Sequence, residues 1–158
     1  MSIITIDLLD ALLSVGEQRG QAEAHLQSLA TMDRVKGLLS ILFELRNEGH
    51  VMLTAVLLRR DIAALAGDAL VNKIDPNIAV NLLKEMVDPL SKLFLNTQMP
   101  DNCRRQLGHC LPEVCSSLSL LSEVDCDAAL KTILDTIAPP VREMNVMLEI
   151  YLILSSLC

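Results

Sequence analysis

The chain has 158 residues, of which 51% are hydrophobic and 21% charged, and its formal net charge is −7. This apolar content excludes intrinsic disorder, which requires low hydrophobicity and high charge. Only 2% of the residues are aromatic and none is Trp, so the composition disfavours a β-sandwich or barrel. The acidic balance argues against a nucleic-acid-binding surface, which is normally basic.

Pro, Gly and polar residues divide the chain into segments with apolar residues at helical spacing, and no segment alternates with a period of two. Ser14 with Glu17 and Ser122 with Asp125 form capping-box-like patterns, Thr31 is a candidate N-cap, and Asp75-Pro76 combines a capping acid with a first-turn proline. The sequence therefore predicts an all-α fold. The expected helices span residues 3–13, 17–30, 31–45, 50–67, 76–95, 101–119, 122–137 and 141–157.

Two prolines fall inside expected helices. Pro89 removes a backbone donor and crowds the preceding turn, so we expect it to kink or split its helix near Asp88. Pro112 lies within the helix expected over 101–119. Residues 68–74 either extend the fourth helix or form a loop.

The helices form four pairs, expected over residues 3–30, 31–67, 75–119 and 122–158. Small or polar residues near the starts of the second helices lie 33, 53 and 37 residues apart. The spacing is irregular, but its mean of 41 matches the period of HEAT and armadillo arrays. We therefore expect a HEAT/armadillo-like α-solenoid. These residues are Ala22, Ala55, Gly108 and Asn145. An arginine lies three positions before three of these residues. The three arginines are Arg19, Arg105 and Arg142, and we expect each to reach a carboxylate in the next repeat.

The C-terminal segment is strongly apolar, with Glu149 as its only charge after Glu143. A solenoid requires a polar face on its last repeat. We therefore expect the chain to be a piece of a longer array, or to self-associate through this helix. The segment Gly49–Leu58 is the longest without Asp, Glu, Lys or Arg, and its ten residues are too few to span a membrane. The N-terminus has no basic region typical of a signal peptide.

Several strings resemble the N-terminal HEAT repeats of the importin-β (karyopherin-β) nuclear transport receptors, and most closely the subclass that carries ribosomal proteins and histones. They are Gln21–Leu29, Ala55–Arg60, Asn102–Leu107 and Pro112–Val114. The chain departs from the family after Arg60, where residues 61–74 are short and Ala-rich instead of a polar insertion. Family members are also several times longer.

The resemblance implies a receptor that shuttles between cytoplasm and nucleus. It implies binding of the small GTPase Ran in its GTP form at these N-terminal repeats, basic cargo proteins, and contacts with nucleoporins. In the family the second helices of the pairs line the inner face where Ran sits. From the acidic charge and the short apolar stretches we expect no nucleic-acid or membrane partner.

Four arginines are candidates for partner binding: Arg59, Arg60, Arg104 and Arg105. The alternative for the first two is structural, because basic residues in the last turns of a helix favour its dipole. One of them is then expected to pair with Asp61, Asp68 or Asp101. The same alternative applies to Arg104 and Arg105, although a position near a helix start is unfavourable to the dipole.

Neither a metal nor a cofactor is expected. Cys103, His109, Cys110 and Cys115 lie on one predicted helix and are too far apart along it to surround a metal ion. Nucleotide-binding, nucleophile-elbow and zinc-protease motifs are missing from the sequence, which indicates a binding protein and not an enzyme.

Two other functions remain open at this point. One is a HEAT or armadillo scaffold or regulatory subunit unrelated to transport. The other is a compact helical adaptor that dimerises through its C-terminal helix.

Overall fold

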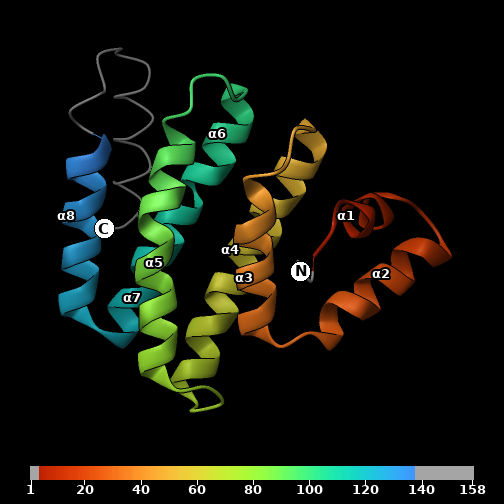
Figure 1. The fold of residues 1–158 in the computed structure, drawn as a ribbon. Helices are drawn as coiled ribbons and strands as arrows, with labels where there is room; N and C mark the ends of the chain where they lie inside the picture. The colour runs from red at the N-terminus through yellow and green to blue at the C-terminus, as the bar shows by residue number, and fades with distance from the viewer. Residues whose placement is uncertain (1–3, 138–158) are drawn as a thin grey trace. The chain divides into compact units, whose positions relative to one another are not determined.

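A computed structural model describes residues 4–137, and within this range the protein is all-helical, without strands (Figure 1). The all-α prediction is therefore confirmed. The expected helix over 141–157, with Arg142 and Asn145, lies outside the described residues. The helices are α1 (Ile6–Leu13), α2 (Glu17–Ser28), α3 (Thr31–Leu42), α4 (Glu48–Leu70), α5 (Pro76–Phe94), α6 (Asp101–Gly108), α7 (Cys110–Leu121) and α8 (Glu123–Ile137).

The chain divides into two compact units, residues 1–61 and 62–158, with the boundary inside α4. Each unit is described by itself below. The first contains α1 to α3 and the first half of α4, and the second contains the rest of α4 and the later helices.

Two predicted helix starts are confirmed. Asp75 is the N-cap of α5, its carboxylate accepts a 2.9 Å hydrogen bond from the amide of Asn77, and Pro76 follows as the first helical residue. The hydroxyl of Ser122 accepts a 3.4 Å hydrogen bond from the amide of Asp125 at the start of α8. Both satisfy backbone donors that the first helical turn leaves without intrahelical partners.

Two other predicted caps are wrong. Ser14 ends α1 instead of opening α2, because its hydroxyl donates a 2.5 Å hydrogen bond back to the carbonyl of Ala11. The N-cap of α2 is Gly16, whose φ of 78° lies in the left-handed region that glycine tolerates best. Thr31 is the first residue of α3, and the N-cap is Ala30, which makes no side-chain cap.

Of the kink or split predicted at Pro89, the split is absent, and a break occurs near Pro112 instead. The helix α5 continues through Pro89, held by the many buried residues around it, so the predicted split does not occur. The helix expected over 101–119 is instead interrupted at His109. Pro112 explains this break, because its ring would clash with the carbonyl of Gly108, four residues earlier. Pro112 is the third residue of α7, where a backbone N–H has no intrahelical acceptor, so the N–H that proline lacks costs no hydrogen bond there.

The structure also settles the extent of α4. The helix begins two residues earlier than predicted, where the side chain of Asn47 accepts a 3.2 Å hydrogen bond from the amide of His50. It continues to Leu70, so residues 68–70 extend it. The chain then turns through Asn72, whose φ is 60°, a conformation that Asn adopts more readily than most residues.

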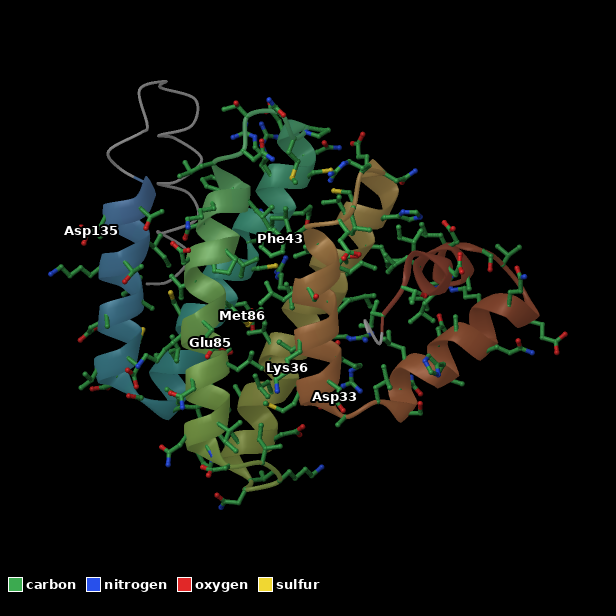
Figure 2. The ribbon with its side chains drawn as sticks, in the orientation of Figure 1. Asp33, Lys36, Phe43, Glu85, Met86 and Asp135 are labelled. Carbon is green, nitrogen blue, oxygen red and sulfur yellow. The ribbon has the colours of Figure 1, made fainter. Side chains whose placement is uncertain are left out.

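In the second unit, α5 packs against α6, α7 and α8, and α7 also packs against α8. Figure 2 labels neighbouring residues of α5 that illustrate its two faces: Met86 is fully buried and Glu85 is exposed. An ion pair of 3.1 Å joins Lys84 Nζ of α5 to Asp125 Oδ1 at the start of α8. A hydrogen bond from Ser122 and the contact with Lys84 lower the pKa of Asp125.

Replacing Lys84 with Met is expected to lower the thermal stability of the protein at neutral pH. The pKa of Asp125 is lowered in the folded state, so the ionised carboxylate stabilises the fold. This stabilisation is present above about pH 4, the usual pKa of an Asp, and is lost as the pH falls through the folded-state pKa. The Tm difference between the wild type and Lys84→Met should therefore shrink below about pH 4.

The matched control is Lys92→Met. It removes the 2.9 Å pair of Lys92 and Asp88 on one exposed face of α5, and such pairs contribute little. Thermal melts followed by circular dichroism between pH 3 and 7 check the prediction. Equal effects of the two variants at every pH would contradict it.

Candidate partner-binding site on α2 and α4

The Ala55–Arg60 string occupies the middle of α4. Ala55 and Leu58 are 1% and 0% exposed, whereas Val56, Arg59 and Arg60 are exposed. The buried positions anchor this helix in the core, and the exposed ones present two adjacent positive charges at the surface.

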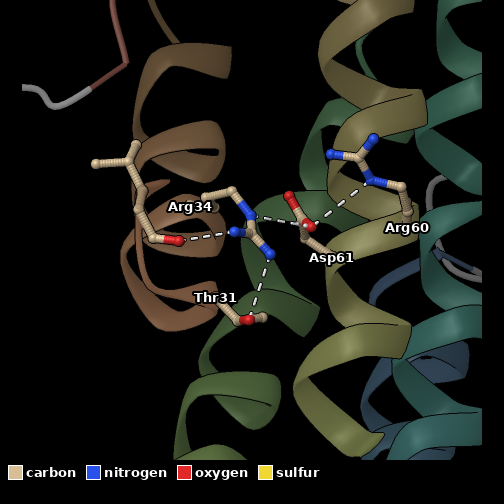
Figure 3. Close-up of polar contacts among 5 residues, drawn as sticks. Thr31, Arg34, Arg60 and Asp61 are labelled. Atoms are coloured by element: carbon tan, nitrogen blue, oxygen red, sulfur yellow. Dashed lines mark hydrogen bonds and ion pairs between the residues drawn. The ribbon is translucent and has the colours of Figure 1, made fainter. Parts of the chain in front are cut away.

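A cluster of charged residues holds α3 against this part of α4 (Figure 3). Arg34 Nε donates to Asp61 Oδ1 at 3.2 Å, and the rest of its guanidinium donates to the carbonyl of Leu29 at 2.7 Å and to the hydroxyl of Thr31 at 3.3 Å. The Asp61 side chain is only 2% exposed, and Arg60 Nε lies 3.7 Å from the same oxygen. The sequence predicts that Arg59 or Arg60 pairs with Asp61, Asp68 or Asp101, and the structure shows Arg60 with Asp61.

Sequence reasoning missed Arg34. A signal was present, because Arg34 lies near the start of its helix, where a positive charge is unfavourable to the dipole. The same signal drew attention to Arg104 and Arg105.

The variant Arg34→Met is expected to destabilise the protein by about 3 kcal/mol, because a buried carboxylate loses its main partner. Adding Asp61→Leu should recover most of this loss, since an apolar pair can replace a buried ion pair at little cost. Urea unfolding followed by circular dichroism measures both.

The control is Arg19→Met, which removes an exposed pair with Glu23 on α2 and should cost less than about 1 kcal/mol. A cost for Arg34→Met as small as that of Arg19→Met would contradict the structural role of the cluster.

The surface next to the cluster is hollowed. A cavity of about 340 Å³ lies among α1, α2 and α4 of the first unit, and we call it the α2–α4 hollow. Residues one and two helical turns apart on α2 and on α4 line it, so each helix contributes one stripe. The apolar lining is Leu12, Leu26, Leu53 and Leu57, and the polar lining is Arg19, Glu23, Gln27 and Arg60.

The polar lining carries more positive than negative charge. Arg19 Nε forms a 3.0 Å pair with Glu23 Oε1 one turn along α2, so these two charges compensate each other. The expectation that Arg19 reaches the next repeat is therefore wrong. The Arg60 side chain is 59% exposed and shares Asp61 with Arg34. The neighbouring Arg59 makes no side-chain hydrogen bond or ion pair with any residue between 4 and 137.

The other two candidate arginines lie in the second unit and differ in accessibility. Arg104 is 6% exposed; its Nη2 donates to Asp101 at 2.5 Å and its Nη1 to the carbonyl of Phe94 at 3.4 Å. Its hydrogen bond and charge lower the pKa of Asp101. Arg104 thus joins the start of α6 to the end of α5, and little of its surface is open to a partner. Arg105 is exposed.

The thiols form no metal site in the described part of the chain. Cys103, Cys110 and Cys115 are buried, and no group of three His, Cys, Asp or Glu side chains between residues 4 and 137 is arranged to hold a metal ion. Burial, and secondarily Cys126, raise the pKa of Cys115 to about 12. A buried thiol with such a pKa is a poor nucleophile.

Among the helices of residues 4–137, none is both long and apolar enough to cross a membrane. Comparison with known proteins finds no matching family model, curated protein or solved structure.

Proposed function

We propose that this chain is an N-terminal portion of an importin-β-type nuclear transport receptor and that it binds Ran in its GTP form. One observation carries the proposal. Two of the strings that resemble that family, Gln21–Leu29 and Ala55–Arg60, are distant in sequence, but residues of both line the α2–α4 hollow. In the family, the second helices of the repeats line the Ran-binding face, and α2 and α4 are the second helices of the first two proposed repeats.

The proposed architecture is a HEAT solenoid with repeats over 3–30, 31–67, 75–119 and 122–158. The packing of α8 on both α5 and α7 supports it, because an added repeat contacts its preceding neighbour. The burial of the small residues that the sequence singled out supports it too, since close helix approach requires small side chains. These are Ala22 in α2, Ala55 in α4 and Gly108, the last residue of α6.

The mechanism would be binding without chemistry. Ran and cargo would favour different curvatures of the array, so each would lower the affinity of the other, as linkage requires. The acidic surface would speed encounter with basic cargo; it includes Glu123, Asp127 and Asp135, all exposed on α8. Shuttling between cytoplasm and nucleus, and contacts with nucleoporins, belong to the same proposal.

The test is binding of the purified chain to Ran loaded with GTP or GDP, measured by biolayer interferometry. We expect binding to the GTP form alone, weakened about tenfold by Arg59→Glu, which corresponds to about 1.4 kcal/mol. Arg59 is suited to this test because its replacement breaks no side-chain hydrogen bond or ion pair within residues 4–137.

The control is Lys36→Glu, an equal charge reversal at an exposed position of α3, labelled in Figure 2, and it should bind as the wild type does. Binding that ignores the nucleotide would contradict the proposal in favour of a HEAT scaffold. Absence of binding together with a compact homodimer in light scattering would favour the helical adaptor.

A further inference from the structure

The α2–α4 hollow has an apolar floor of a size suited to side chains. Leu26 and Leu57 are 3% and 8% exposed and leave their remaining surface toward the cavity, and Leu12 and Leu53 are half-buried beside them. A volume of about 340 Å³ is at the lower end of the roughly 300–1,000 Å³ range of ligand pockets. The hollow therefore fits one or two aliphatic side chains better than a large cofactor.

Arg60 is the group on the rim with unused binding capacity. Its Nε lies 3.7 Å from Asp61 Oδ1, beyond a good hydrogen bond, and this oxygen already accepts from Arg34 at 3.2 Å. Asp61 is also almost completely buried, so it cannot turn outward to cover Arg60. Most guanidinium donors of Arg60 are therefore available to an acceptor from outside.

The opposite rim adds no acid that could attract a basic partner. Among residues 4–137, Glu23 is the only carboxylate lining the hollow, and Arg19 Nε lies 3.0 Å from its Oε1. Gln27, one turn further along α2, is neutral and exposed. The net positive charge of the rim therefore comes from Arg60, and the adjacent Arg59 adds to it.

We propose that the α2–α4 hollow docks an acidic, leucine-containing segment of a partner protein. An aliphatic side chain of the segment enters the floor between Leu26 and Leu57, and a carboxylate one or two residues away binds the guanidinium of Arg60. Arg is suited to this role because its planar fork binds a carboxylate through two parallel hydrogen bonds. The chemistry follows from the hollow itself, and only the identity of the partner as Ran rests on the proposed function.

The test titrates two acetylated peptides, SELLES and SKLLKS, into the full chain labelled with ¹³C at Leu and Val methyl groups. We expect the acidic peptide alone to shift the methyl signals of Leu26, Leu53 and Leu57, with saturation. The variant Arg60→Met should weaken its binding at least tenfold, and Arg60→Glu should reverse the preference toward the basic peptide. Lys36→Glu, the control, should leave both titrations unchanged.

Equal responses to the two peptides, shifts confined to other methyl groups, or indifference to both Arg60 variants would overturn the inference. Arg60→Met is included because it places no second negative charge beside Asp61, so its fold should survive if that of Arg60→Glu does not. Selective binding of the acidic peptide without any binding of Ran would contradict the proposed function and leave this inference standing. Binding of Ran-GTP without peptide selectivity would overturn this inference alone.

Discussion

The contact between Arg34 and Asp61 is the constraint on which the first unit of this protein depends. An ionised carboxylate that is 2% exposed is costly unless a partner compensates it. Arg34 provides this compensation and is itself fixed by Leu29 and Thr31 at the junction of α2 and α3. One buried charge thus links α3 to α4 and to the end of α2.

A second polar contact acts at the other end of the same stretch of α4. His50 is largely buried, and its Nε2 lies 2.6 Å from Asp10 Oδ1 of α1. The two contacts are eleven residues apart on α4, a separation of about 16 Å along the helix axis. Between them lie Leu53, Leu57 and Arg60, which form the α4 side of the hollow. Polar contacts therefore fix α4 on both sides of the hollow. A rigid binding surface favours recognition because less conformational entropy is lost on binding.

Local features of the fold were predictable from the sequence where they depended on neighbouring residues. Asp75-Pro76 and Ser122 marked helix starts correctly because capping involves atoms within one turn. The cap predicted at Ser14 was wrong because its hydroxyl donates to the carbonyl of Ala11 in the preceding helix instead of capping the next one. The split predicted at Pro89 does not occur, because burial of the surrounding α5 residues outweighs the loss of one hydrogen bond.

The candidate site was predictable only in part. Arg60 and its contact with Asp61 followed from adjacency in the chain, but the α2–α4 hollow required residues 12 to 60 to come together in space. No pattern of neighbouring residues in the sequence predicts this packing of distant segments. Arg104 and Arg105 illustrate the same limit, since adjacent residues with the same charge are respectively buried and exposed. The helical period separates them, and only the packing of α6 decides which one faces inward.

Hydrogen–deuterium exchange of the chain with Ran tests most directly whether the second helices form a shared binding face. The account predicts slower amide exchange over residues 19–27 and 53–60 when Ran carries GTP, and no such change when it carries GDP. Unchanged exchange in both stretches, or protection confined to α3, would contradict it.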